Sequence, residues 1–302
     1  MDDILQAVSK SHNLNYTKPL FELRKLGCCS IKRQLLLAKD VVEMNRLVTG
    51  LIILLLIIPS TAPTQVWEGQ DCGEEVEAVL QANKGAILSV RIDSLWSHFE
   101  GRPYLGGTLT PAGEQEELII RVDVFDCITW IDHAVALLSA LSWEEYQEKL
   151  ISNRYFNKEI SFQTRRHFFT DWLERPEWEV PQFARQASSR KMLNRRSDGT
   201  SWIEELPFVE REIAWLPTDS LNIYRHLLQS GDLVGFYSEL DGLDVSHVGM
   251  LQIKSGKPWL LHASSKSGRL ERVAFIEQAG ISSGVVILRK EWGSELKVKP
   301  GL

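Results

Sequence analysis

Asp123-Val-Phe-Asp-Cys127-Ile-Thr-Trp-Ile-Asp-His-Ala-Val-Ala-Leu-Leu138 is the stretch that decides the predicted fold. Its apolar residues recur at helical spacing, at Ile128, Ile131, Val135 and Leu138. Asp126 is a favourable N-cap residue, and Thr129 with Asp132 resembles a second, slightly shifted capping box. The pattern therefore predicts a buried helix whose first turn contains Cys127.

The position of Cys127 at the start of this helix favours a reactive thiolate. Unpaired backbone N–H groups and the positive end of the helix dipole both stabilise negative charge there. The thiolate is the form in which a cysteine acts as a nucleophile. The alternative is a buried cysteine that packs like a small hydrophobic residue. The stretch by itself leaves both interpretations open.

The composition is that of a globular protein without a nucleic-acid partner. The 302 residues are 44% hydrophobic and 25% charged, and the net charge is −6. The body of the chain shows no Lys/Arg-dense segment of the kind that binds nucleic acid.

An apolar run over residues 47–58 predicts an export signal. It follows Met44-Asn-Arg46 and ends at Pro59-Ser-Thr-Ala-Pro63, as is typical of a secretory signal peptide. A transmembrane helix needs about 20 apolar residues, so a membrane anchor with a short cytoplasmic tail is the less favoured alternative. We expect an upstream extension over 1–43, a signal peptide over 44–62 and one folded domain over 68–300. The exported part is more acidic, and we expect no stable association with a membrane.

The cysteines and histidines indicate neither a disulfide scaffold nor a metal site. Of four cysteines, only Cys72 and Cys127 lie in the part expected to be exported. One bridge between them would consume the proposed nucleophile. A zinc set of Cys127, His133, His247 and His262 is disfavoured, because His133 lies six residues further along the helix and points to another side. We therefore expect no metal and no cofactor.

The remaining pattern places helices before strands. Helices are expected over 74–87, 89–99, 142–150 and 218–228, with a short strand over 117–122. Residues 176–200 are only weakly periodic and are expected to form an insertion. Strands are expected over 233–238, 247–253, 259–263 and 285–289, joined as antiparallel hairpins. Helices followed by a strand meander predict an α+β fold.

Two histidines in the strand region complete a candidate constellation. His247 starts one predicted strand, His262 ends the next, and Ser255-Gly256 supplies the turn between them. The histidines are then neighbours across a hairpin, near the ~5 Å cross-strand spacing. A cysteine helix packed on that sheet brings the Cys127 sulfur beside His247, with nucleophile, base and orienting group together.

A polar and aromatic segment over residues 164–172 is ambiguous on its own. It contains Arg166, His167, Asp171 and Trp172. Such side chains can form a surface segment with a few buried aromatic rings. They can also line a ligand-binding cleft, where polar and stacking contacts are both needed.

Several spaced blocks of the sequence form a pattern that extends beyond the cysteine stretch. The first block is Phe125-Asp-Cys127-Ile-Thr129-Trp, followed by Ala134-Val-Ala-Leu-Leu138. Later blocks are Gly231-Asp232-Leu-Val, Gly242-Leu-Asp-Val-Ser246-His247-Val-Gly249 and Leu261-His262-Ala-Ser264-Ser265. In this order the blocks resemble the DUF1460 family, a branch of the NlpC/P60 papain-like cell-wall hydrolases. Residues 166–172 carry Phe where the family more often has Tyr, and Tyr104-x-x-Gly107-Thr108-Leu fits upstream. The match runs from about 104 to 289 and is weakest over 176–200.

The resemblance implies an N-acetylmuramoyl-L-alanine amidase with a papain-like core, in which the cysteine helix packs on an antiparallel sheet and additional N-terminal and inserted helices surround it. Cys127 is then the nucleophile, His247 the base and His262 its orienting partner. The implied substrate contacts are Tyr104, Arg166, His167, Asp171, Trp172 and Ser246. The implied partners are peptidoglycan fragments, met after export to the periplasm.

Two other functions stay open at this point. The commoner NlpC/P60 activity is that of a γ-D-glutamyl-diamino acid endopeptidase, which cleaves further along the same peptide. A non-catalytic muropeptide-binding module would keep Cys127 as an ordinary thiol. The two enzymes differ in the amine that they release, and the binding module differs from both in the reactivity of its cysteine.

Overall fold

A computed structural model describes residues 66–68, 72–110 and 115–292. The predicted upstream extension over 1–43 and the signal peptide over 44–62 lie outside these residues and stay predictions. Among the described residues, none of the helices combines the length and the apolar character needed to cross a membrane.

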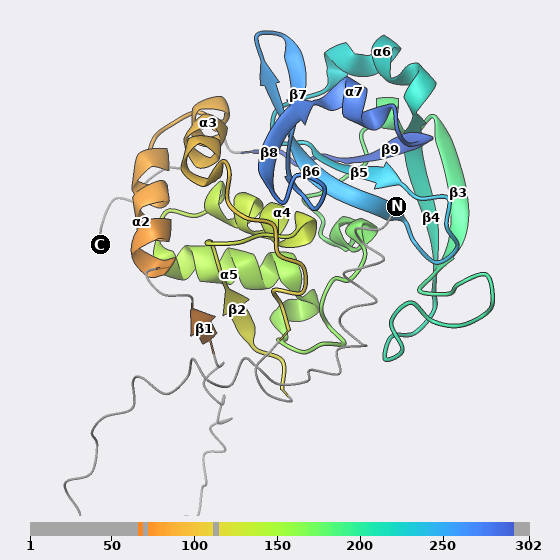
Figure 1. Cartoon of the computed structure of the whole chain (residues 1–302), viewed down its shortest axis with the longest axis horizontal. Coiled ribbons are helices and arrows are strands. Elements are labelled where there is room, and N and C mark those ends of the chain that lie inside the picture. The colour runs from red at the N-terminus through yellow and green to blue at the C-terminus, as the bar shows by residue number, and fades with distance from the viewer. Residues whose placement is uncertain (1–65, 69–71, 111–114, 293–302) are drawn as a thin grey trace, which may run out of the picture. The chain divides into compact units, whose positions relative to one another are not determined.

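The first half of the described chain is mainly helical (Figure 1). Its four long helices are α2 (Cys72–Asn83), α3 (Leu88–Phe99), α4 (Cys127–Leu137) and α5 (Trp143–Arg154). Strands β1 (Val66–Glu68) and β2 (Leu118–Ile120) form a small parallel pair. Short turns of 3-10 helix follow, at Phe156–Lys158, Phe169–Glu174 and Gln182–Ala184. Each predicted helix in this half is present, within a few residues of its expected bounds.

A seven-stranded antiparallel sheet dominates the second half. Its strands are β3 (Ala187–Leu193), β4 (Val209–Pro217), β5 (Leu233–Tyr237), β6 (Val245–Lys254), β7 (Lys257–Ser264), β8 (Arg269–Ala274) and β9 (Gly284–Leu288). The spatial order is β3-β4-β9-β5-β6-β7-β8. Every residue of the central strands β5 and β9 is buried. The mixed architecture with an antiparallel sheet agrees with the α+β expectation.

Three strands of this half, β3, β4 and β8, are missing from the predicted set, and one predicted helix is wrong. Residues 176–200, expected to form an insertion, contain edge strand β3, which pairs with β4 along its whole length. The strands β4 and β8 were not expected at all. Residues 218–228 do not form one helix but break into Thr218–Ser220, α6 (Leu221–Tyr224) and Arg225–Leu227. Leu221 and Leu228 are buried, but Leu227 between them is 38% exposed, so the apolar face that would stabilise one longer helix is only partly buried.

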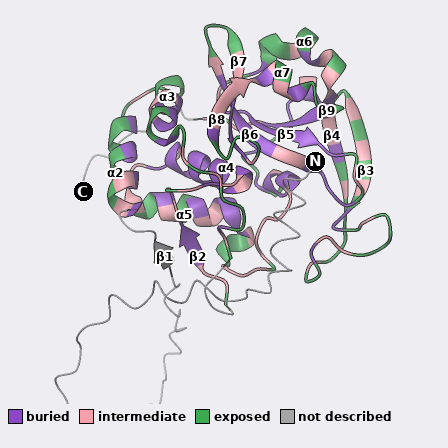
Figure 2. Ribbon diagram, in the orientation of Figure 1, coloured by how far each residue is buried: buried purple, intermediate pink, exposed green. Residues whose placement is uncertain are grey.

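Helix α4 is buried on nearly every side, as its purple ribbon in Figure 2 shows. It packs against α5 on one side and against β6 and β7 on the other. Trp130 fixes this packing, because its indole N–H donates a 3.0 Å hydrogen bond to the carbonyl of Leu261 in β7. The Trp130 ring also meets Phe99 and Phe125 edge to face. The start of α4 is therefore held in a constant position beside the sheet.

Candidate active site

A reciprocal capping box orders the first turn of α4. The Asp126 carboxylate accepts the backbone N–H of Thr129 at 2.7 Å, and the Thr129 hydroxyl accepts the backbone N–H of Asp126 at 2.9 Å. The predicted N-cap at Asp126 is confirmed. The second box of Thr129 with Asp132 is wrong, because Asp132 is turned toward α5 instead. Cys127 is the first residue of the helix, and it is 5% exposed.

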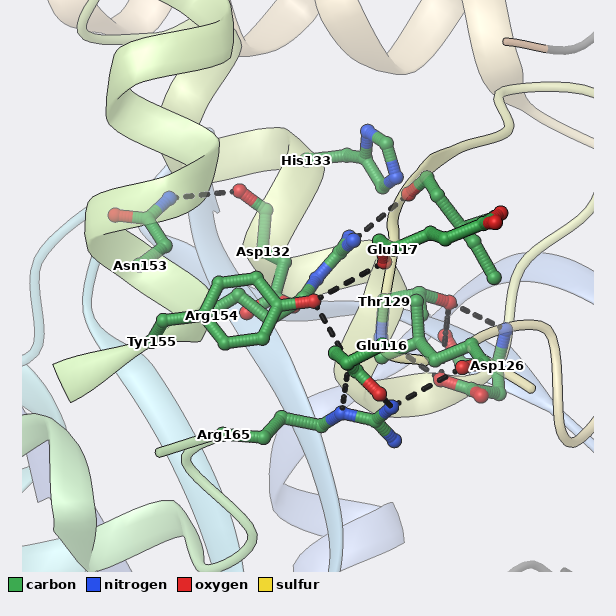
Figure 3. Close-up of polar contacts among 12 residues, drawn as sticks. Glu116, Glu117, Asp126, Thr129, Asp132, His133, Asn153, Arg154, Tyr155 and Arg165 are labelled. Atoms are coloured by element: carbon green, nitrogen blue, oxygen red, sulfur yellow. Dashed lines mark hydrogen bonds and ion pairs between the residues drawn. The ribbon is translucent and has the colours of Figure 1, made fainter. Parts of the chain in front are cut away.

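Figure 3 shows the polar network that surrounds the helix start. Asp132 pairs with Arg154 of α5 at 3.1 Å, and both side chains are buried. Burial raises the pKa of Asp132 to about 6, against the attraction of Arg154. The His133 ring lies 2.5 Å from the Tyr146 hydroxyl of α5, and burial lowers the pKa of His133. This imidazole therefore belongs to the contact between α4 and α5.

Cys127 lines a cavity of about 90 Å³. Two of the predicted substrate contacts, Tyr104 and His167, lie in its wall. The other lining residues come from the helix start, the segment before Thr170, and the loops around 202 and 244: Asp126, Ile128, Phe168, Phe169, Trp202, Ile203, Leu243, Asp244 and Val245. The cavity is therefore enclosed by parts of the chain that are far apart in sequence.

The two predicted histidines contact each other. Nε2 of His247 lies 2.7 Å from Nδ1 of His262, and the rings meet edge to face with centroids 4.9 Å apart. The hairpin that joins their strands turns at Ser255 and Gly256, with φ of 53° and 71°, as a tight two-residue turn requires. The predicted juxtaposition of the histidines is confirmed.

The pairing is diagonal rather than directly across the hairpin. Met250 pairs with Leu261, so the register brings Gly249 opposite His262. His247 lies two residues before Gly249 on β6. A Cβ on Gly249 would lie 3.1 Å from the Cβ of His262. The absent side chain gives the His262 ring room to lean toward His247. A β-bulge opposite Phe236 and Tyr237 also redirects the start of β6, as bulges near functional sites commonly do.

Glu271 is a neighbour of the pair that the sequence did not reveal. It lies on β8 directly opposite His262, and its Oε1 is 3.7 Å from Nε2 of His262. That distance is longer than a hydrogen bond, so the contact is electrostatic. The available signal was the Lys266-Ser-Gly268 turn followed by the alternation of Leu270 with polar residues, which together indicate a further strand.

The histidine pair opens onto a second cavity of about 440 Å³. Its lining is rich in hydroxyl groups and includes one cation, Lys266, and one carboxylate, Glu239. Ser246, a predicted substrate contact, lies in this wall. The preceding residue, Val245, lines the cysteine cavity. The start of β6 therefore contributes one residue to the wall of each cavity.

The other predicted substrate contacts lie outside the two cavities. The Arg166 guanidinium stacks over Phe156 at 4.2 Å, and burial lowers its pKa. Asp171 caps the 3-10 turn at Phe168 and pairs with Arg211 at 2.6 Å. Trp172 is 2% exposed and packs edge to face on Trp178. Its ring belongs to the core, and the substrate contact expected at Trp172 stays a prediction.

A contact with Phe162 holds His167 in the wall of the cysteine cavity. Its Nε2 lies 2.8 Å from the carbonyl of Phe162, and the two rings are in contact.

Within the described residues, no three His, Cys, Asp or Glu side chains converge to hold a metal ion.

Solved structures with this fold come from several bacteria. A DUF1460 protein from Legionella pneumophila is 18% identical, with a TM-score of 0.60, over 72% of this chain and 92% of that one. An N-acetylmuramoyl-L-alanine amidase from Bacteroides uniformis is 21% identical, with a TM-score of 0.54, over 64% and 95%. A Bacteroides fragilis protein provisionally named a xylanase is 25% identical, with a TM-score of 0.55, over 63% and 96%.

No curated protein matches the chain. A family model does match, over residues 94–277, which include the cysteine helix, the histidine hairpin and Glu271. The chain therefore belongs to the AmiA-like family, whose members are described as N-acetylmuramoyl-L-alanine amidase-like.

Proposed function

We propose that the chain is an exported cysteine amidase with a papain-like NlpC/P60 core. It hydrolyses the amide bond between N-acetylmuramic acid and L-alanine in peptidoglycan fragments, and it uses Cys127, His247 and His262. The observation that carries this proposal is the 2.7 Å contact between two imidazoles on the sheet against which the capped cysteine helix packs. Family membership supports the hydrolase class and the peptidoglycan substrate.

In this mechanism His247 takes the thiol proton at Nδ1, because its Nε2 is engaged by His262. The Cys127 sulfur attacks the carbonyl carbon of the lactyl group, and the Cys127 backbone N–H stabilises the oxyanion. The C–N bond then breaks, and His247 returns the proton to the departing amine of L-alanine. Water activated by His247 cleaves the resulting thioester, which restores the thiol and releases the lactyl carboxylate.

Glu271 supports this mechanism by selecting a tautomer of His262. A carboxylate beside Nε2 favours the proton on that nitrogen, which leaves Nδ1 of His262 as an acceptor. Nε2 of His247 must then donate across the 2.7 Å contact. The lone pair of His247 is thereby directed to Nδ1, where the thiol proton is taken. The same arrangement stabilises the imidazolium that forms beside the thiolate.

The test is digestion of a defined muropeptide by wild type and by Cys127→Ala. Wild type should release a peptide with a free L-alanine amine, seen by mass spectrometry, with a bell-shaped pH dependence of kcat/KM. Cys127→Ala should lose at least about 10³-fold in kcat while keeping its circular-dichroism spectrum. Substantial activity in that variant would sink the mechanism.

The same digestion separates the alternatives. An endopeptidase would release the diamino acid amine and leave L-alanine on the sugar. A binding module would release nothing, and its Cys127 would be alkylated by iodoacetamide no faster than a free thiol of ordinary pKa.

A further inference from the structure

A third cavity, of about 260 Å³, has a strongly basic lining. Its residues are Arg190, Lys191, Met192, Arg195, Arg196, Ser197, Asp241 and Gly242. Four of these eight side chains are cationic and one is a carboxylate. Residues 185–197 contain five cations and no acidic residue, in a chain whose net charge is −6.

One of the four cations has a structural role. Lys191 Nζ donates to the carbonyls of Ser238, Leu240 and Leu243, the last two at 3.0 and 3.1 Å. Burial lowers the pKa of Lys191. Its ammonium therefore holds β3 against the loop between β5 and β6. Arg190 pairs with Glu210 of β4 at 4.0 Å. The cations of the lining that remain to face a ligand are therefore Arg195 and Arg196.

The basic cavity adjoins the cysteine cavity. Asp241 and Gly242 line the basic one, whereas the next three residues along the chain line the one that contains Cys127. Trp202 joins the two, because its ring lines the cysteine cavity while the Arg196 guanidinium stacks over it at 4.3 Å. Its indole N–H also donates to the carbonyl of Asp241 at 2.8 Å.

The backbone segments between the two cavities are closely packed. Gly242 has φ of 81°, and a Cβ there would lie 2.5 Å from the carbonyl oxygen of Arg195. The amide N–H of Asn194 donates to the carbonyl of Gly242 at 2.9 Å. The arginines that follow Asn194 are therefore held at a constant distance from the loop that leads to the cysteine cavity.

We infer that the basic cavity is a subsite for free carboxylates on the peptide stem of the substrate. This inference rests on the proposed function, in which Cys127 keeps the lactyl acyl group and the leaving group is a peptide that starts at L-alanine. On the sugar side, the lactyl carboxylate of muramic acid is consumed in the amide bond. The carboxylates of the intact fragment therefore lie on the stem. Arginine recognises a carboxylate with two parallel hydrogen bonds, which are stronger than neutral ones.

The test compares two muropeptides that differ only in whether the stem carboxylates are free or amidated. Binding is measured by calorimetry in the Cys127→Ala background, with and without Arg195→Gln and Arg196→Gln. We expect the parent to bind the free form about tenfold or more tightly than the amidated form, since charge-assisted hydrogen bonds are lost on amidation. The arginine variants should lose that preference and bind the amidated form as the parent does.

Arg225→Gln is the matched control, because Arg225 is an exposed arginine outside the three cavities. It should keep the preference for free carboxylates. Equal affinity of the parent for the two muropeptides would overturn the subsite, and so would an unchanged preference after both arginine substitutions. Failure of the proposed function is distinguished by the wild-type digestion, which tests turnover whatever the charge preference is.

Discussion

His262 lies between two groups with different roles, and this arrangement decides how His247 can act. On one side Nδ1 meets Nε2 of His247 at 2.7 Å, and on the other Nε2 faces Glu271 at 3.7 Å. Two neutral imidazoles in contact share one proton, so one ring must donate and the other accept. A negative charge beside Nε2 of His262 makes that ring the acceptor. The proton-accepting site of His247 is thereby turned away from the pair.

Glu271→Gln should lower the reactivity of Cys127 without changing the fold. The amide removes the charge that selects the His262 tautomer, so less thiolate forms beside His247. Glu271 is 24% exposed, so solvent weakens the effect, and we expect a loss of about three- to tenfold in kcat/KM. The alkylation rate of Cys127 at neutral pH should fall in parallel, which a purely structural role would not cause. Glu271→Asp should restore part of it.

Glu277→Gln serves as the control for that experiment. It also removes one carboxylate, on α7 (Phe275–Ala279), but its side chain is exposed. Its kcat/KM and alkylation rate should equal those of wild type. If Glu271→Gln behaves in the same way, the tautomer argument fails, whereas the assignment of Cys127 and His247 is untouched.

The residues predicted from sequence differ in how local their signals are. The helix-start position of Cys127 can be predicted from a helix cap, and the histidine hairpin from a two-residue turn. Each of these signals involves only a few adjacent residues. Glu271 depends on a strand pairing that only the folded sheet defines. The assignment of Trp172 to the substrate follows only from the family resemblance, whereas its burial depends on Trp178, which packs on its ring.

At the scale of elements, Gly249 links the hairpin to the geometry of the site. A methyl group there would lie 2.7 Å from a Leu260 methyl carbon and 2.9 Å from the Leu261 carbonyl oxygen, as well as close to His262. Gly249→Ala should therefore push the two strands apart. We expect a loss of about 1–3 kcal/mol in the free energy of unfolding and a fall in kcat, because His262 is displaced from His247.

Gly73→Ala is the comparison for that measurement by urea denaturation. Gly73 lies in α2, and a methyl group added there would have no neighbouring atom within 4 Å. Alanine should therefore be neutral or stabilise the helix by about 0.5–1 kcal/mol. Equal stabilities for Gly249→Ala and wild type would contradict the close approach of β6 and β7 at this residue.

The elements that the sequence missed share a physical reason. Strand β3 reads Ala-Ser-Ser-Arg-Lys-Met-Leu, and as an edge strand it exposes every second side chain to solvent. Such a strand lacks the apolar run that marks a central strand. By contrast, β5 and β9 are buried throughout and were predicted within a residue or two. A buried strand has a run of apolar residues that can be recognised in the sequence, whereas an exposed edge strand does not. Buried strands are therefore the ones that can be predicted before the fold is known.

At the scale of the whole molecule, the candidate site takes its geometry from two parts of the core. The cysteine comes from a helix buried among other helices, and the imidazoles come from the sheet. Trp130 joins the two parts through Leu261, the residue beside His262. Loss of core packing should therefore disturb the site before the chain unfolds, because a small shift of α4 changes the distance between thiol and imidazole.

Buried carboxyl groups give the whole molecule a distinct pH dependence of stability. Asp132, Asp171, Asp232 and Asp244 are buried, and burial raises the pKa of each above its usual value. For Asp171 the pKa rises to about 6, although Arg211 opposes the shift. A carboxyl group with a raised pKa in the fold binds its proton more tightly there than in the unfolded chain. Its stabilising contribution is complete below the unfolded pKa and is lost as the pH rises through about 6.

Asp171→Asn should remove the contribution of this carboxyl group to the change in the free energy of unfolding between pH 7 and pH 5. Wild type should gain about 1 kcal/mol more than the variant in the free energy of unfolding when the pH is lowered from 7 to 5. Urea denaturation at both pH values measures it, and the exposed Asp219→Asn gives the comparison for loss of one surface carboxylate. The amide oxygen of asparagine can still accept from Phe168 or Arg211, so the cap is largely kept. A larger gain in Asp171→Asn than in wild type would mean that Arg211 outweighs burial at this carboxylate, and that the pair stabilises the fold at neutral pH.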